Sequence, residues 1–264
     1  MDVFDPAANK WTRLADLPEP LTHAATVADG KNILLIGGYV GDHPAPGTRS
    51  VWKFDTRKNR FEPLPPLPAP RGAGAAAILG TNLHFFGGVV RDQHGNSIRD
   101  SANHWMLDLT NIDAGWQAKR SLPNPRNHLA GVTAGGRIFA IGGQYLDDEY
   151  DQNQSDVHVY NPHTDRWWQA ASLPRGVGHI NASTFGLNDR IYVVGGAINV
   201  NGSKINEADK IYSYDVYTNN WSTVGSLPAP RKSPLANVVD DELLVIGGAT
   251  PYPTDQTWRT PLPA

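Results

Sequence analysis

A pair of glycines recurs five times along the 264-residue chain, and each pair ends a short run of apolar residues. The pairs are Gly37-Gly38, Gly87-Gly88, Gly142-Gly143, Gly195-Gly196 and Gly247-Gly248. Their first glycines are separated by 50, 55, 53 and 52 residues, which is close to the period of known repeat architectures. A chain of this kind is expected to fold as a series of similar modules.

The third module shows the signals of four strands, which we call A to D. Residues His128 to Ala134 are small and apolar, and Arg137 to Ile141 alternate before the glycine pair. Val157 to Tyr160 alternate again, and Trp167 opens a fourth segment that runs toward Leu173-Pro174. Short alternating segments separated by turn residues predict antiparallel β-strands.

The other modules repeat these signals. Strand B recurs at Ile33 to Ile36, Leu83 to Phe86, Ile191 to Val194 and Leu243 to Ile246. Strand C recurs at Trp52 to Asp55, Trp105 to Asp108 and Tyr212 to Asp215, and strand D opens on Phe61, Trp116 and Trp221. A Leu-Pro pair follows each strand D, at Leu17-Pro18, Leu67-Pro68, Leu122-Pro123, Leu173-Pro174 and Leu227-Pro228.

The two ends of the chain complete the count of strands. Val3 to Asp5 and Trp11 to Leu17 match strands C and D, whereas Leu235 to Val239 and Leu243 to Gly248 match strands A and B. We therefore predict an all-β propeller of five four-stranded blades in a single domain, residues 1–264. Its last blade combines residues 1–17 with residues 230–248, which leaves no exposed edge. Two alternatives stay open: strand C of that blade is Thr257 to Arg259, or the propeller is larger.

The repeated pattern resembles the Kelch repeat over nearly the whole chain. A strand ending in Gly-Gly is followed by an aromatic residue before Asp-Pro or Asn-Pro, as in Tyr160-Asn161-Pro162, and by an aromatic residue such as Trp167. The resemblance implies a β-propeller of four-stranded blades. Kelch propellers most often have six or seven blades, so a count of five departs from the common pattern.

Composition excludes several classes of protein. The net charge of −3 and the pI near 6.3 lack the basic character of nucleic-acid-binding proteins, and they equally disfavour an anionic membrane surface. The absence of cysteine excludes disulfides, thiolate nucleophiles and cysteine-ligated zinc. The first residues have no basic region before an apolar core, and no apolar run reaches the roughly 20 residues of a membrane span. We expect a soluble protein with no signal peptide in this chain, of undetermined compartment.

One position in each module is the main candidate for function. Counting six residues from the leucine of each Leu-Pro pair gives His23, Ala73, His128, His179 and Ser233, which we call the ring position. In Kelch proteins that bind peptides, the corresponding residue resembles a ligand-facing position at the channel mouth. Three histidines there are compatible with a polar ligand site, with a metal site or with acid-base chemistry. They are equally compatible with caps on the inner strands.

Arginine precedes the ring position by two residues in three modules. These residues, Arg71, Arg126 and Arg231, suit either a carboxylate clamp or hydrogen bonds to backbone carbonyls. The second role fits better because the Pro-Arg pair belongs to the repeat.

The loops between strands B and C differ most between modules, so they are expected to determine the choice of ligand. Residues just after the glycine pairs are expected to face the same mouth: Tyr39, Arg91, Gln144, Tyr145 and Asn199. The acidic loop Leu146 to Asp156 is interpreted as solvated, since it lacks the spacing of a calcium-binding loop. Asn96, Asp100 and His104 are similar in spacing to the iron ligands of plant specifier proteins of the Kelch class, although Asn96 replaces an acid.

Three functional hypotheses remain at this stage. The first is a binding module for a peptide, a protein segment or a small polar ligand at the face of the D-to-A and B-to-C loops. The second is a sugar-directed enzyme similar to Kelch-type sialic acid mutarotases, and the third is a metal-dependent enzyme that uses the three histidines. No cofactor is expected, and no catalytic residue is assigned.

Overall fold

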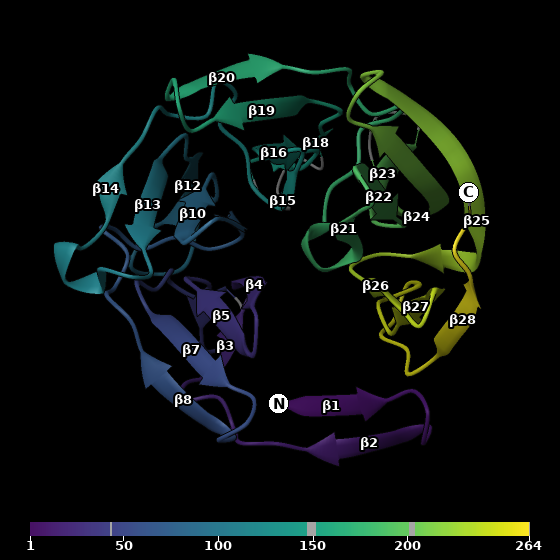
Figure 1. The fold of residues 1–264 in the computed structure, drawn as a ribbon, viewed down its shortest axis with the longest axis horizontal. Helices are drawn as coiled ribbons and strands as arrows, with labels where there is room; N and C mark the ends of the chain where they lie inside the picture. Colours follow the sequence, from purple (N-terminus) through teal and green to yellow (C-terminus); the bar gives the residue numbers. More distant parts are fainter. Residues whose placement is uncertain (43, 147–151, 201–203, 264) are drawn as a thin grey trace.

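The computed structural model describes residues 1–42, 44–146, 152–200 and 204–263, and strands account for nearly all of its regular structure. Figure 1 shows the sheets arranged around a central axis, with the chain passing from one blade to the next. The predicted all-β, five-bladed propeller is confirmed. No helix among the described residues is long and apolar enough to cross a membrane.

Four blades have four antiparallel strands each, which are named below in order from the axis outward. The first blade contains β4 (Ala25–Asp29), β5 (Asn32–Ile36), β7 (Val51–Asp55) and β8 (Arg60–Pro63). The second contains β9 (Ala75–Leu79), β10 (Asn82–Phe86), β13 (His104–Asp108) and β14 (Gln117–Ala118). The third contains β15 (Ala130–Ala134), β16 (Arg137–Ile141), β19 (Val157–Asn161) and β20 (Arg166–Gln169). The fourth contains β21 (Thr184–Leu187), β22 (Arg190–Val194), β24 (Lys204–Asp215) and β25 (Asn220–Arg231).

Short strands after the glycine pairs form a second layer of pairing. They are β6 (Tyr39–Val40) with β3 (Leu21–Thr22), β11 (Val89–Arg91) with β12 (Ser97–Asp100), β17 (Gln144–Tyr145) with β18 (Gln152–Asn153), and β23 (Ala197–Val200) with β24. Two 3₁₀ turns, η1 (Ile112–Ala114) and η3 (Asn181–Ser183), complete the described elements.

The last blade differs from the prediction. Its strands are β26 (Leu235–Val239), β27 (Glu242–Ile246) and β28 (Thr257–Pro261), and β28 pairs with β27 along its whole length. The assignment of Val3 to Asp5 as the third strand of this blade is therefore wrong. Instead, β1 (Asp2–Asp5) pairs with β2 (Lys10–Arg13) as a separate hairpin, which lies between β28 and β8 (Figure 1).

The hairpin keeps the local structure of a strand C and a strand D. Its rings Phe4 and Trp11 stand 5.0 Å apart, as do Tyr214 and Trp221 in the fourth blade. The backbone N–H of Ala15 donates a hydrogen bond to Asn59 in the first blade. Trp11 is nevertheless 50% exposed, because no blade covers it in the way that the third blade covers Trp221.

The glycine pairs join each blade to the next. In the first four blades the N–H of the second glycine donates to a carbonyl in the following D-to-A loop, at 2.8 to 2.9 Å. A Cβ on Gly142 would lie 2.3 Å from the oxygen of Val177, so only glycine permits this approach. The first glycine of the fifth pair is less crowded: among the described residues, the nearest atom to a Cβ on Gly247 is the oxygen of Thr254, at 3.3 Å.

The core lies between neighbouring blades rather than at the axis. Four clusters of buried apolar residues each join two blades, from the first and second to the fourth and fifth. The aromatic residues that open strand D contribute here, and the indole nitrogens of Trp116, Trp167 and Trp221 each donate to a carbonyl of the preceding blade. The packing leaves the inner strands and their loops around the axis free to form a site.

Candidate functional site

All five residues of the ring position adopt the left-handed conformation, with φ between 49° and 55°. Their backbones connect one blade to the next: the N–H of Ala73 donates to His23, that of His128 to Ala73, and that of His179 to His128, at 2.8 to 3.0 Å. The left-handed turn directs the chain from the loop into the inner strand. The ring position is therefore defined by backbone geometry, whichever side chain it carries.

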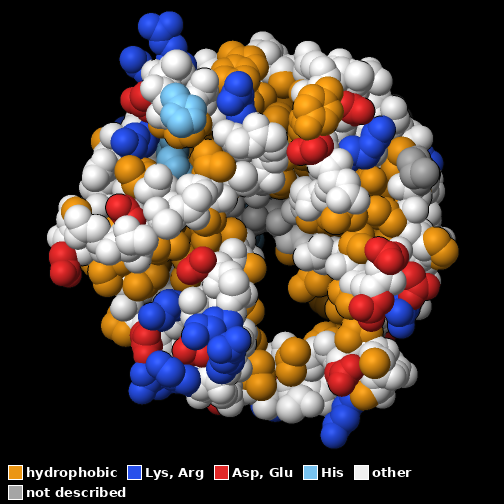
Figure 2. Space-filling view, in the orientation of Figure 1, with side chains coloured by type: hydrophobic (Ala, Val, Ile, Leu, Met, Phe, Trp, Pro, Cys, Tyr) orange, Lys and Arg blue, Asp and Glu red, His pale blue; other side chains and the backbone are white. Residues whose placement is uncertain are grey.

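The ring position lines a cavity at one end of the central channel, which we call the mouth pocket. The pocket has a volume of about 520 Å³. Its lining consists of Thr22, His23, Ala24, Thr26, Ala73, Gly74, His128, His179, Asn181, Ala182, Ser233 and Leu235. Figure 2 shows an opening at the centre of the molecule with hydrophobic side chains beside it. Among the described residues that line the pocket, none is acidic, lysine or arginine, so these walls carry little charge.

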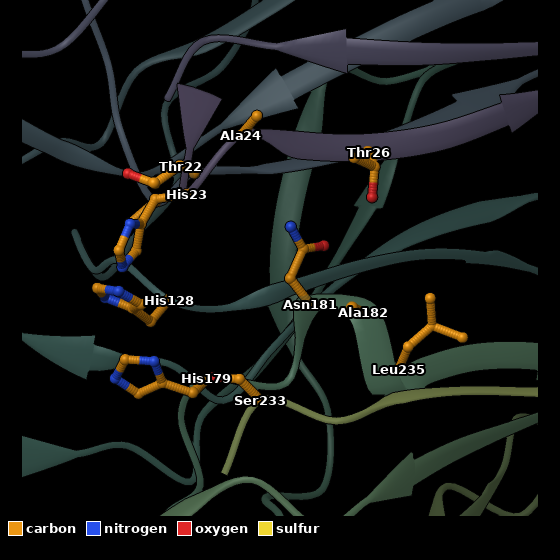
Figure 3. Close-up of a pocket in the computed structure, with 12 residues that line it drawn as sticks. Thr22, His23, Ala24, Thr26, His128, His179, Asn181, Ala182, Ser233 and Leu235 are labelled. Carbon is orange, nitrogen blue, oxygen red and sulfur yellow. The ribbon is translucent and has the colours of Figure 1, made fainter. Parts of the chain in front are cut away.

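The three histidines form a column along one wall of the pocket (Figure 3). The rings of His128 and His179 are 4.0 Å apart and tilted by 35°, whereas His23 meets His128 edge-on at 5.1 Å. His23 is exposed, and the other two are largely buried. His128 contacts the side chains of Asn127 and Gln144 through Nδ1. The histidines therefore present ring faces and edges, a surface suited to flat or apolar groups.

Metal binding by these histidines finds no support in the geometry. Among the residues that the structure describes, no three His, Asp or Glu side chains are grouped so as to hold a metal ion. The spacing of Asn96, Asp100 and His104 does not produce a cluster either. Asn96 bonds to Asp92, Asp100 accepts from Asn127, and His104 lies buried in the second blade.

The three arginines before the ring position are buried within their own blades. Arg126 donates to the carbonyls of Gly142, Asn124 and Ala140, and its burial lowers its pKa to about 10. Arg71 and Arg231 lie over Trp105 and Trp258 and donate to Asn103 and Gln256. None of the three lines the mouth pocket, so the proposed site does not include them.

The residues after the glycine pairs connect neighbouring loops and do not line the pocket. Tyr39 and Gln144 are fully buried, and the Arg91 guanidinium lies 3.8 Å from the centre of the Tyr39 ring. Tyr145 donates to Asn124, and Asn199 accepts from the backbone and side chain of Asn153. Of the acidic loop, Asp147, Asp148, Glu149 and Asp151 lie outside the described residues, and Asp156 accepts from Asn124.

Sequence reasoning missed the opposite wall of the pocket. Asn181 and Ala182 reach it from η3, and Leu235 reaches it from β26 with half of its surface exposed. A signal for η3 exists in the sequence. The ring position precedes the first glycine of its pair by 16 residues in the fourth module and by 14 in the other four. In the structure the first strand of the fourth blade begins at Thr184, five residues after His179, whereas the other four first strands begin two residues after the ring position.

The fold and the repeated mouth geometry define a β-propeller built from Kelch-type blades, and comparison with known sequences identifies the family. The KLHDC2/KLHL20/DRC7 Kelch-repeats domain matches residues 1–196, and the Kelch motif matches residues 181–228. The protein belongs to the Kelch-repeat family, as its sequence motifs predicted.

Relatives with similar sequences include Kelch-like proteins from animals and fungi. Kelch-like protein 23 of Pongo abelii is 28% identical over 97% of this chain and 36% of its own length. Kelch-like protein terF of Aspergillus terreus is 31% identical over 52% of this chain and 30% of its own, and beta-scruin of Limulus polyphemus is 31% identical over 51% and 14%. The chain thus spans about a third or less of the length of these relatives.

Proposed function

We propose that the protein binds a segment of another protein at the face formed by the D-to-A loops, with one uncharged side chain or loop tip inserted into the mouth pocket. The mouth pocket carries this proposal. It combines a volume sufficient for one large side chain with histidine ring faces, alanines and an exposed leucine. Such a concave site with a few convergent polar groups is typical of ligand sites in general.

The charge of the lining favours a neutral occupant. A bound carboxylate or phosphate gains most from arginine or lysine, and the arginines of the repeat are directed into the blades. The catalytic hypotheses have weaker support, because Asp and Glu are absent from the described lining and the rings of His128 and His179 pack against each other at 4.0 Å. A protein segment with an apolar or aromatic side chain fits these walls better than a charged metabolite does.

The test begins with selection of peptides from a displayed random library against the purified protein. The dissociation constants of selected peptides are then measured by fluorescence anisotropy for the parent protein and for Leu235→Asp and His128→Asn. Asparagine tolerates the left-handed conformation of His128, so this variant changes the wall while keeping the turn. Tyr217→Ser is the control, because Tyr217 is 79% exposed and lies outside the pocket lining.

We expect both pocket variants to weaken binding at least about tenfold, which corresponds to about 1.4 kcal/mol, and the control to leave it unchanged. The proposed function would be contradicted if the selected peptides bound both pocket variants as tightly as the parent protein. It would also be contradicted if the selection yielded no specific binder.

A further inference from the structure

The fourth blade contains an insertion that the other blades lack. The additional residues lie between His179 and Thr184, and they form η3, Asn181–Ser183. In the other four blades the first strand begins two residues after the ring position, and those blades fold without an insertion. The fold therefore does not require the additional residues of the fourth blade.

The turn η3 lies beside the central channel, next to the inner strands. It contacts β4, β15, β22 and β26, so that strands of four different blades surround it. Its position is fixed by two hydrogen bonds to the carbonyl of Ile180, from the N–H of Ser183 at 3.2 Å and from the hydroxyl of Thr184 at 2.8 Å. Ile180 and Ser183 are fully buried. The turn is therefore anchored in the fourth blade.

Two cavities lie on either side of η3. The mouth pocket is on one side, and a second cavity of about 500 Å³, lined by the inner strands of all five blades, is on the other. Four residues line both cavities: Thr26, Asn181, Ala182 and Leu235. The shared residues place η3 between the two cavities, where it forms part of the wall of the mouth pocket opposite the histidines.

The side chain of Asn181 extends from η3 with its amide directed into the mouth pocket. Figure 3 shows the amide between His128 and Thr26, above Ala182. The residue is partly exposed, and its side chain makes no hydrogen bond to any residue that the structure describes. An asparagine amide offers two N–H donors and one carbonyl acceptor. All of these groups are available to a ligand.

We propose that Asn181 is the specificity-determining residue of the mouth pocket and that it selects a neutral amide, the group every peptide chain presents, over a carboxylate. This inference rests on the proposed function, since it names the chemistry by which the same pocket recognises a protein segment. A neutral amide can exchange donor and acceptor hydrogen bonds with Asn181. A carboxylate entering the same pocket loses hydration and meets no lysine or arginine in return.

The experiment compares two probes that differ in one group. N-acetyl-L-phenylalaninamide and N-acetyl-L-phenylalanine are titrated at pH 8 into ¹⁵N-labelled protein, and their dissociation constants are taken from the shift of the His128 backbone amide. The Asn181 side-chain amide is a second reporter in the parent protein. We expect the neutral amide to bind about fivefold or more tightly than the carboxylate. Asn181→Ala is expected to weaken the neutral amide about fivefold, as loss of one hydrogen bond of about 1 kcal/mol implies, and to remove most of the preference.

Asn237→Ala is the matched control, because Asn237 lines only the cavity beyond η3. Asn181→Leu preserves side-chain size while removing the hydrogen-bonding groups, and it is expected to behave as Asn181→Ala does. Circular dichroism and the melting temperature establish that each variant is folded. Equal binding of both probes by the parent protein, or an unchanged preference in the Asn181 variants, overturns the inference.

Two outcomes separate this inference from the proposed function. Displayed peptides that require the parent His128 but bind Asn181→Ala with full affinity overturn the role of Asn181 and support the proposed function. A clear Asn181-dependent preference between the two probes, with no specific peptide recovered, supports the inference and contradicts the proposed function.

Discussion

A pair of buried histidines should make the folded protein sensitive to acid. His84 on β10 and His104 on β13 are 2% and 1% exposed, and Nδ1 of His84 lies 2.8 Å from Nε2 of His104. Nδ1 of His104 lies 3.1 Å from the carbonyl oxygen of Arg120, so it must donate. Nε2 of His104 therefore accepts from His84, and both rings are neutral. Protonation of His104 would break this bond, and Nε2 of His84 is buried without a partner for a second proton.

Burial, reinforced for His84 by its histidine partner, lowers the pKa of His84 to about 3 and that of His104 to about 4. In the unfolded chain each imidazole has its ordinary pKa of about 6.5, so acid favours the unfolded state. The stability that depends on these neutral histidines is fully present above pH 6.5, and it is lost progressively as the pH falls toward 4. Each pH unit below 6.5 costs about 1.4 kcal/mol per histidine, which gives about 2 kcal/mol each at pH 5 and about 4 kcal/mol for the pair. Both folded-state pKa values lie below 5, so the pair is almost entirely neutral in the folded protein at pH 5. The sum of about 4 kcal/mol therefore hardly depends on which of the two histidines has the lower pKa.

The measurement is urea unfolding, followed by tryptophan fluorescence, at pH 8 and at pH 5. The double variant His84→Phe/His104→Phe removes both titrating groups and fills a site already surrounded by aromatic rings. The carbonyl of Arg120 keeps the indole N–H of Trp167 as its donor. The loss of unfolding free energy between the two pH values should be smaller by about 4 kcal/mol in the double variant than in the parent.

His163→Ala serves as the control, because His163 is exposed in the turn between β19 and β20. It should reproduce the pH dependence of the parent protein. An equal loss of stability in the parent and in the double variant would refute the reasoning, since it would show that the pair does not titrate as a buried neutral unit.

Three further predictions concern the backbone and the buried arginines. His128→Val should lower the free energy of unfolding by about 1–2 kcal/mol more than His128→Asn, since a β-branched residue is strained at φ 49°. Urea titration measures both variants, and equal unfolding free energies would show that the turn is not constrained. Gly143→Ala places a Cβ 2.6 Å from the Asn127 oxygen and should lower the free energy of unfolding by about 2 kcal/mol or more. Gly30→Ala, with open space around it, should lower it by about 1 kcal/mol or less. Similar melting temperatures of the two variants would argue against the close approach at Gly143. Arg126→Met leaves the carbonyls of Gly142 and Ala140 without their buried donor and should cost about 3 kcal/mol, so a stability equal to that of the parent would contradict its structural role.

Much of the propeller could be predicted because the repeat supplies the same evidence five times. Strand order, the turn after the glycine pairs and the ring position all follow from constant offsets along the chain. The closure could not be predicted, since Val3 to Asp5 and Thr257 to Arg259 both read as short strands. Which of them pairs with β27 depends on the path around the ring, which local sequence does not determine.

Only one wall of the mouth pocket, the wall with the three histidines, could be predicted from the sequence. The histidines of the ring position were found because their offset repeats, whereas Asn181 belongs to an insertion that no other blade contains. The sequence predicts that Tyr39 faces the mouth, and it leaves the arginines two roles, of which hydrogen bonding to backbone carbonyls fits better. Their burial is a tertiary property, set by how adjacent blades meet.

The backbone hydrogen bonds that link the ring-position residues from His23 to His179 have a consequence for the evolution of such a protein. Because main-chain atoms alone make these bonds, the residues of the ring position can be exchanged without disturbing the bonds that hold the mouth together. The five blades already carry histidine, alanine and serine there. A new binding preference can therefore arise through single substitutions at the rim, limited only to residues that accept a left-handed backbone.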